Sequence, residues 1–238
     1  MMDELLIARD GAMLTLTLNR PDKMNALSAP LVESLLDQIQ QASTSDVRLL
    51  VLKGNGRNFS AGFDFGGYED LSEGDLVLRF VRIEQLLQAV YHAPFDTLAL
   101  AHGRNFGAGV DLICSCGRRV ADPGATFRMP GLSFGLVLGT RRYAERVGNA
   151  LARQVLEEGQ AFDTTEALAA GFLTKAAPKE DWDEVVASAA ATSVRLSVEA
   201  NADLIAATST DTRAMDLADL VTSAARPGLK ERIRAYRA

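Results

Sequence analysis

Two short apolar segments, residues 47–52 and 97–101, are each followed by a glycine-containing turn and then by a stretch with helical periodicity. The first is an almost continuous apolar run, which is typical of a strand buried in a parallel sheet. The helix expected at 74–92 carries apolar residues at helical spacing, namely Leu76, Phe80, Ile83, Leu87 and Val90. Strands that alternate with helices in this way predict an α/β layered core.

The N-terminal segment predicts a β-hairpin. Residues 5–7 and 13–18 are rich in apolar residues, and Asp10–Gly11 lies between them. This pair favours a tight hairpin turn, because such turns need positive φ angles. The other expected elements are a helix at 30–42, a helical segment at 110–116, short strands at 118–121, 125–127 and 172–175, and two or three amphipathic helices in the last fifty residues.

Composition narrows the class of protein. Of the 238 residues, 47% are hydrophobic and 24% charged, which predicts a folded chain rather than a disordered one. The net charge of −6 gives no basic field to attract nucleic acid or an anionic membrane. No apolar run approaches the ~18 residues of a membrane span, and the N-terminus lacks a signal-peptide pattern. We therefore expect neither a nucleic-acid nor a membrane partner.

Cysteine and histidine usage excludes two other classes of site. Cys114 and Cys116 are too close in sequence for an ordinary disulfide, and His92 and His102 are the only histidines. A zinc site needs about three or four ligands, so no metal site is expected. Two unpaired cysteines favour a reducing compartment, and we predict a cytoplasmic location. The cysteines are interpreted as buried, inert thiols.

The two glycine-containing turns are the strongest candidates for chemistry. They span residues 57–64 (RNFSAGFD) and 102–111 (HGRNFGAGVD). Small residues let a ligand approach the backbone, and helix starts leave free N–H groups. Two such turns side by side could direct two N–H donors at one oxyanion. Close packing between strand and helix is the alternative. Neither turn is followed by a P-loop lysine, and the second does not fit the dinucleotide fingerprint.

Several segments resemble the enoyl-CoA hydratase/isomerase family, also called the crotonase family. They are residues 18–28 (LNRPDKMNALS), the two turns, residues 127–136 (FRMPGLSFGL) and residues 167–173 (ALAAGFL), and they follow the family's order. The resemblance implies an α/β fold with a crotonase-like ββα spiral core at 1–185. A helical C-terminal region at 186–238 would make contacts in a homotrimer or a dimer of trimers. The implied substrate is a coenzyme A thioester, with no separate cofactor.

The same resemblance assigns roles to individual residues. The backbone N–H groups of Phe63 and Ala108 correspond to the family's oxyanion hole, although the family usually has glycine in place of Ala108. The segments that correspond to the coenzyme A contacts contribute Lys23, Asn25, Ala26 and Leu27 from the first, and Ser60, Ala61 and Asp64 from the second. Lys23 or Arg57 could meet a phosphate or remain a solvated surface cation, and Asp64 could line the pocket or cap its loop.

The sequence departs from the family at the acid/base positions. Hydratases of the family use two glutamates; the corresponding residues here are Asp111 and Gly131. Asp111 is therefore the candidate acid/base, with a helix-start carboxylate as the structural alternative. A single carboxylate favours double-bond isomerisation over hydration. An acyl-CoA decarboxylase or thioesterase of the same family, or a CoA-binding protein with little catalysis, are the alternative functions.

Other polar residues have structural interpretations. His102 is interpreted as structural and Trp182 as a packing residue. Arg128, Arg141 and Arg142 could pair with a substrate carboxylate or a phosphate, or form surface or intersubunit salt bridges. The stretch between Gly135 and Gly139 is shorter than in the family, so we expect a different pocket wall there.

Overall fold

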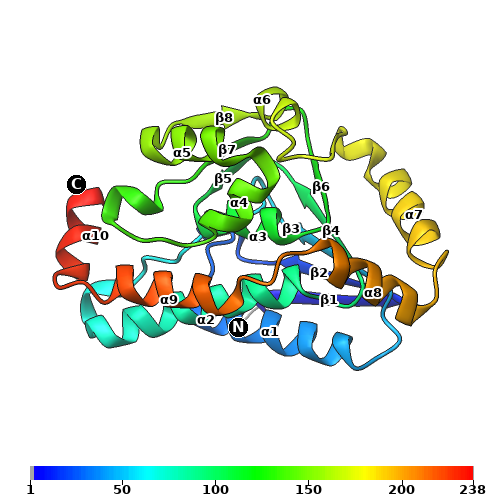
Figure 1. Ribbon diagram of the computed structural model, residues 1–238, viewed down its shortest axis with the longest axis horizontal. Coiled ribbons are helices and arrows are strands. Elements are labelled where there is room, and N and C mark those ends of the chain that lie inside the picture. Colours follow the sequence, from blue (N-terminus) through cyan, green and yellow to red (C-terminus); the bar gives the residue numbers. More distant parts are fainter. Residues whose placement is uncertain (1–2, 238) are drawn as a thin grey trace.

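The computed structural model describes residues 3–237, and its centre is a six-stranded sheet (Figure 1). The strand order is β1-β2-β3-β4-β6-β9. The strands β1 and β2 form an antiparallel hairpin, and every later pairing in this sheet is parallel. Their bounds are Leu5–Asp10, Met13–Leu18, Leu49–Gly54, Asp96–Ala101, Arg118–Ala121 and Lys175–Ala176 for β1, β2, β3, β4, β6 and β9.

A second, three-stranded sheet has the order β5-β7-β8. It consists of β5 (Arg104–Phe106), β7 (Thr126–Arg128) and β8 (Ala161–Asp163). The pairing of β5 with β7 is parallel, and that of β7 with β8 is antiparallel. The sequence predicts β7 within one residue, but neither β8 nor β5, which lies inside the second glycine-containing turn.

Helices pack around the two sheets. Their bounds are α1 Ala29–Ser43, α2 Glu73–Tyr91, α3 Ala108–Ser115, α4 Thr140–Val147, α5 Asn149–Glu158, α6 Thr164–Ala169, α7 Trp182–Ser193, α8 Val198–Thr208, α9 Arg213–Ala224 and α10 Leu229–Arg237. In Figure 1, α1 and α2 lie along one side of the large sheet with α9 beside α2. Within residues 3–237, no helix is both long and apolar enough to cross a membrane.

Local sequence explains where the two long helices begin. The Ser28 side chain accepts a hydrogen bond from Leu31 N, 3.2 Å away, which caps α1. Ser72 and Asp75 form a reciprocal capping box at the start of α2. The apolar faces of both helices are buried, with Leu35 and Leu87 each fully inaccessible to solvent. Predictions of helices at 30–42 and 74–92 are thus confirmed within one residue at each end.

Of the C-terminal helices, α9 and α10 pack against the rest of the chain, whereas α8 is mostly exposed. The helix α9 contacts α2, and α10 contacts the short 3-10 helix at Gly131–Phe134. In α8, by contrast, Asn201 is the one buried residue among those described. The expected division between residues 185 and 186 lies within α7, and it stays a prediction. The strand expected at 172–175 is wrong in extent, because Phe172 and Leu173 are buried core residues before β9 begins at Lys175.

Candidate functional site

The two glycine-containing turns lie directly against each other. Gly62 has a φ of +76°, and a Cβ built on it would lie 2.3 Å from Phe106 O and 2.9 Å from Ala108 N. A Cβ on Gly109 would lie 2.5 Å from Ser60 O. These distances are far too short for any side chain, so glycine at both positions is what lets the turns meet. The sequence interpretation as adjacent turns is supported by this contact.

A buried polar hub fixes the conformation of the first turn. Asn25 is fully buried in the left-handed region, with a φ of 52°. Its side-chain amide donates to Asn55 O and Asn58 O at 2.9 and 2.8 Å, and its Oδ1 accepts from Arg20 N at 2.8 Å. Asparagine tolerates this backbone region better than most residues. The Asn25 amide therefore holds two loops together.

Two backbone N–H groups are left free at the junction of the turns. Phe63 pairs with Leu27 through an isolated parallel bridge, in which Leu27 N donates to Gly62 O and Asp64 N donates to Leu27 O. This pattern uses the neighbours of Phe63 and leaves its own N–H facing away. Ala108 is the first residue of α3, where N–H groups have no intrahelical acceptor. Neither N–H has a hydrogen-bond acceptor among residues 3–237.

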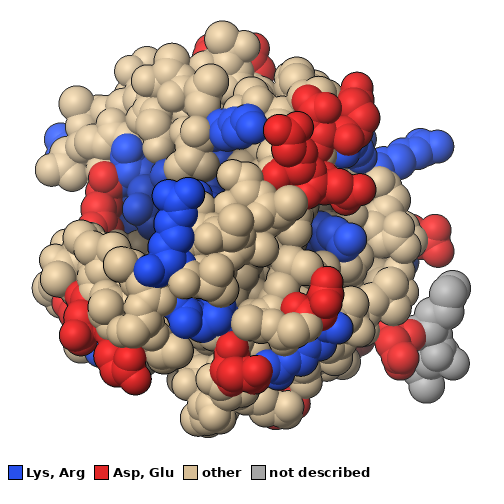
Figure 2. Space-filling model, turned by 90° about the vertical axis from the view of Figure 1, so that its right-hand side faces the viewer, with Lys and Arg blue, Asp and Glu red and all other residues tan. Residues whose placement is uncertain are grey.

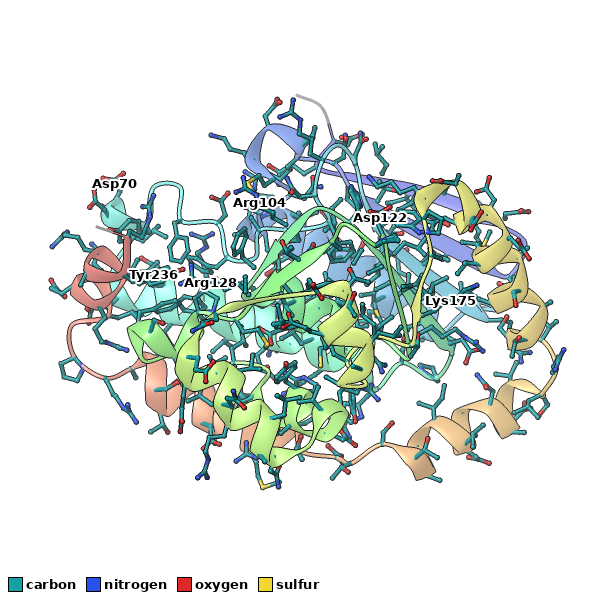
Figure 3. All side chains as sticks on the ribbon, turned by 90° about the horizontal axis from the view of Figure 1, so that it is seen from above. Asp70, Arg104, Asp122, Arg128, Lys175 and Tyr236 are labelled. Atoms are coloured by element: carbon teal, nitrogen blue, oxygen red, sulfur yellow. The ribbon has the colours of Figure 1, made fainter. Side chains whose placement is uncertain are left out.

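Both residues line a cavity of about 200 Å³. The wall is mostly apolar and comes from several segments, including η3 (Gly131–Phe134) and α10. In Figure 3, Tyr236 of α10 and Arg128 lie towards the same end of the molecule, and Lys175 lies towards the other. The lining residues that matter for chemistry are Phe63, Ala108, Asp111 and Gly131.

Asp111 is the one carboxylic acid among the described residues that line this cavity. It lies in the first turn of α3 and is 3% exposed, and its Oδ1 has no hydrogen-bond partner within the described chain. Burial raises the pKa of Asp111 well above the ordinary value of an aspartate; the charge of Arg142 opposes this rise and that of Glu84 adds to it. A buried carboxyl without a partner is a costly feature that structure alone does not require.

An ion cluster lies behind the cavity and joins three helices. Arg142 of α4 pairs with Glu84 of α2 and with Asp216 of α9, and all three side chains are at least 93% buried. Arg142 Nη1 is 3.0 Å from both Glu84 Oε1 and Asp216 Oδ2. The prediction of a surface or intersubunit salt bridge for Arg142 is wrong, because burial against two acids within the same chain satisfies this guanidinium.

The two arginines considered together with Arg142 from the sequence, Arg141 and Arg128, also bind groups of the same chain. Arg141 pairs with Asp216 and Asp219 on α9. Arg128 Nε donates to Gly159 O at 2.6 Å. His102, which was interpreted from the sequence as structural, is buried. Its Nε2 lies 3.0 Å from Gly56 O, and its ring is edge-on to that of Trp182.

The two cysteines are buried, in agreement with their interpretation as inert thiols. Burial raises the pKa of Cys114 to about 11 and that of Cys116 to about 12, so neither is a thiolate at neutral pH. Within the described chain, no three His, Cys, Asp or Glu side chains come together in a metal-binding group.

The segments expected to hold coenzyme A are brought together, although two of their polar side chains are occupied. Ala61 N donates to Met24 O at 2.8 Å, and Ser60 Oγ donates to Asn25 O at 2.9 Å. Ser60 and Asn25 therefore offer a ligand little beyond their backbone. Ala26 and Leu27 are buried, Lys23 is exposed, and Ala61 lines the cavity.

Asp64 caps its own loop and forms an ion pair. Its Oδ1 accepts from Gly66 N at 2.8 Å, and its Oδ2 lies 2.8 Å from Arg20 Nη1. Partial burial raises the pKa of Asp64, but the Gly66 hydrogen bond and Arg20 outweigh it and hold the pKa below its ordinary value. The loop-capping interpretation describes this residue, and Asp64 is not among the residues that line the cavity.

The aromatic part of the wall and one glycine were not predicted from the sequence. Phe65, Phe106, Phe134 and Tyr236 line the cavity. Phe106 and Phe134 lie in two of the quoted segments, but no common motif indicates that the four rings meet. Gly139 touches the carboxyl of Asp111. The shortened stretch before Gly139 was the one signal, since it indicated an altered pocket wall.

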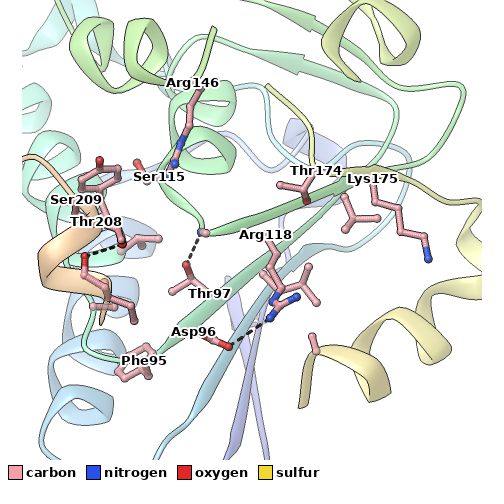
Figure 4. A pocket seen from close by; sticks show the side chains of 18 of the residues that line it. Phe95, Asp96, Thr97, Ser115, Arg118, Arg146, Thr174, Lys175, Thr208 and Ser209 are labelled. Atoms are coloured by element: carbon pink, nitrogen blue, oxygen red, sulfur yellow. Dashed lines mark hydrogen bonds and ion pairs between the residues drawn. The ribbon is translucent and has the colours of Figure 1, made fainter. Parts of the chain in front are cut away.

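A second, larger hollow of about 590 Å³ lies elsewhere (Figure 4). It lies at the starts of β4 and β6, where Arg118 and Asp96 form an ion pair of 3.7 Å, and Lys175 lines it too. Ligands of parallel sheets bind beyond the opposite, carboxyl ends of the strands. Figure 2 views the molecule from the side of α7 and α8, and both basic and acidic side chains lie on this face. The smaller cavity is therefore the better candidate for chemistry.

Comparison with known proteins agrees with this fold. Residues 8–226 match the family model for "Enoyl-CoA hydratase/isomerase". The 2,3-dehydroadipyl-CoA hydratase of Escherichia coli is 31% identical over 186 residues, which cover 75% of this chain and 71% of that protein.

Solved structures extend the likeness to almost the whole chain. A Bordetella parapertussis crystal structure, described as a candidate enoyl-CoA hydratase/isomerase, has a TM-score of 0.98 and 52% identity, and covers 99% of this chain and 98% of its own. The enoyl-CoA hydratase structure from Bacillus halodurans has a TM-score of 0.87 at 22% identity, with 98% and 100% coverage, and shows the shared fold. The expected crotonase-like α/β fold is confirmed, and the chain belongs to the enoyl-CoA hydratase/isomerase family.

Proposed function

We propose that the cavity binds an acyl-CoA thioester and that Asp111 is its single acid/base, which favours double-bond isomerisation over hydration. The observation that carries this proposal is the unpartnered, buried carboxyl of Asp111 beside two free N–H groups. Gly131 lines the same cavity at the position of the family's second glutamate and brings no side chain. Hydration needs a water that is oriented by two groups, whereas isomerisation needs one base that accepts and returns a proton.

In the proposed reaction, the thioester oxygen accepts hydrogen bonds from the N–H groups of Phe63 and Ala108. The Asp111 carboxylate removes a proton from C2 of a 3-enoyl thioester, and the electron pair of that C–H bond delocalises onto the thioester oxygen. The resulting Asp111 carboxyl returns the proton to C4, which leaves the double bond between C2 and C3. Each oxyanion donor of this kind lowers the barrier by about 3 kcal/mol.

The raised pKa of Asp111 suits both halves of this proton transfer. A carboxylate that is poorly solvated is a stronger base than an exposed one, and its pKa moves towards the operating pH. Ser115 Oγ donates to Asp111 O at 2.9 Å, which anchors the backbone of that turn. The apolar wall keeps water away from the enolate.

Coenzyme A itself would lie across the backbone of residues 23–27 and 60–64, whose contact is described above. Lys23 is exposed beside this junction and is the proposed phosphate contact. The substrate is the only small molecule that the proposal needs.

Exchange of the α-proton tests the proposal directly. The protein is incubated with acyl-CoAs in deuterated water, and the thioesters are analysed by mass spectrometry. We expect deuterium incorporation that is lost in Asp111→Asn while binding persists. Binding without exchange in the wild type would contradict a base at Asp111 and favour decarboxylation, hydrolysis or a non-catalytic role.

We also propose that the C-terminal region makes the contacts of a homotrimer or a dimer of trimers. The support is α8, where Val198 and Leu204 are 49% and 51% exposed. Light scattering on the purified protein measures the mass. We expect a multiple of three chains, with dissociation in Leu204→Glu, and a monomeric wild type would refute this assembly.

A further inference from the structure

The wall of the candidate cavity is unusually aromatic. Five of the chain's ten phenylalanines line it, together with one tyrosine. These rings are Phe63, Phe65, Phe80, Phe106, Phe134 and Tyr236. They come from α2, β5, α10 and the loops between, so no single motif places them together. Half of the phenylalanines therefore meet around one small space.

The rings form a connected series rather than isolated contacts. Phe80 stacks on Phe63 with centroids 4.2 Å apart, and Phe63 meets Phe65 edge-on at 5.0 Å. Phe65 is edge-on to Phe134 at 6.2 Å, and Phe134 lies 5.2 Å from Tyr236. Aromatic rings prefer to contact one another by stacked faces or by an edge against a face, and both kinds of contact occur within this wall.

The size and polarity of the cavity restrict the kind of acyl group that it can hold. A dry cavity of about 150 Å³ accommodates benzene, and this one measures about 200 Å³. Among the described residues that line it, none is Lys, Arg or His. The guanidinium groups of Arg79 and Arg237 lie over the rings of Phe63 and Phe65 and outside the lining. A terminal carboxylate on the acyl group would therefore find no cation in the lining itself, which disfavours its burial. A long aliphatic chain would exceed the volume.

We propose that the acyl group taken by this site is short and carries a flat aromatic ring. This inference rests on the proposed function, since it assumes that the cavity holds the acyl part of a coenzyme A thioester. The ring would contact Phe65 and Phe134, while the thioester lies beside the N–H groups of Phe63 and Ala108.

Two saturated thioesters of equal length test this proposal in the wild-type protein. They are 3-phenylpropanoyl-CoA and 3-cyclohexylpropanoyl-CoA, which have no double bond to move and differ in whether the ring is flat and aromatic. Calorimetry gives both Kd values, with coenzyme A alone as the reference. We expect the phenyl compound to bind about 2- to 10-fold more tightly, because aromatic pairs contribute about 0.5–1.5 kcal/mol beyond area burial.

A matched pair of variants tests whether any preference for the phenyl compound arises in this cavity. Phe65 and Phe162 are both half-buried and each lies within ring contact of three aromatic neighbours, but Phe65 lines the cavity and Phe162 does not. Phe65→Leu should reduce the phenyl preference towards unity, and Phe162→Leu should leave it unchanged.

The outcomes separate this inference from the function on which it rests. Equal affinity of the wild type for the two thioesters, both above that of coenzyme A, would overturn the aromatic preference and leave acyl-CoA binding in place. Thioesters that bind no better than coenzyme A would instead overturn the proposed function. This comparison of ligands holds even if Phe65→Leu fails to fold.

Discussion

Gly139 lies directly against the carboxyl group of Asp111: a Cβ built on Gly139 would come within 2.0 Å of Asp111 Oδ1 and 2.6 Å of its Cγ. Gly139 also has a φ of +64°, in the left-handed region. The position of the carboxyl in the cavity thus depends on the absence of one methyl group from the next segment of the wall.

Gly139→Ala should therefore displace the Asp111 carboxyl and reduce α-proton exchange by about 100-fold, since small misplacements of reacting groups cost this much. Gly11→Ala is the control, because Gly11 also has a positive φ but has nothing near its missing Cβ. Both variants carry the backbone penalty of about 1–2 kcal/mol. Equal activity of the two variants would show that the carboxyl position is unimportant.

Asp111→Asn should stabilise the protein at neutral pH. The folded-state pKa of Asp111 is raised above its ordinary value of 3.8, so ionisation costs folding free energy. Wild-type stability relative to Asp111→Asn should fall as the pH rises from about 4 through the raised pKa. Each kcal/mol gained by the variant raises Tm by about 2–4 °C for a chain of this size.

Asp64→Asn should change the stability in the opposite direction. Its folded-state pKa is lowered, so its contribution to stability is present above the unfolded-state pKa and is lost as the pH falls through the folded one. In melting curves between pH 3 and 8, Asp64→Asn should have a lower Tm than the wild type at neutral pH, and the difference should shrink as the pH falls. If Asp111→Asn and Asp64→Asn shifted Tm in the same direction at pH 7, the opposite pKa shifts given to these two carboxyl groups would be contradicted.

Gly131→Glu should introduce hydration. A Cβ at this position would lie 3.3 Å from Leu136 O, which is tight but needs a shift of only a few tenths of an ångström. A second carboxylate in the cavity could orient water for addition to a 2-enoyl thioester, and such groups contribute about 10²–10⁴-fold. Formation of 3-hydroxyacyl-CoA is the measurement, with Gly131→Ala as the control. Equal hydration by both variants would exclude position 131 from that role.

Two adjacent arginines should differ sharply in their effect on stability. Arg142→Met leaves the buried carboxylates of Glu84 and Asp216 without their cation, and should cost about 3–5 kcal/mol in unfolding free energy. Arg141→Met removes pairs from a side chain that is 40% exposed, and should cost less than about 1 kcal/mol. Urea denaturation measures both, and similar losses would refute the distinction.

Local sequence predicted the elements that local physics controls. The N-terminal hairpin and the helices near 30–42 and 74–92 follow from turn chemistry and periodicity, and the structure confirms them. The turn itself lies one residue later than predicted, at Gly11–Ala12, because Asp10 ends β1 and pairs with Met13. Family motifs located the two turns, and the glycine contacts bring them together. The aromatic wall and the partners of Arg142 could not be predicted, because Phe65, Phe134 and Tyr236 meet only through tertiary packing.

The helix α10 closes one side of the cavity with Tyr236, and it is held by hydrogen bonds from Arg232 to Phe134 O and from Lys230 to Glu69 O. A molecule that fills the cavity and contacts Tyr236 would bind the docked form of this helix better than an undocked one. By thermodynamic linkage, an occupant must therefore oppose the local opening of residues 229–237. Amide hydrogen exchange in this helix would thus report occupancy of a cavity whose proposed acid/base, Asp111, lies more than a hundred residues earlier in the chain.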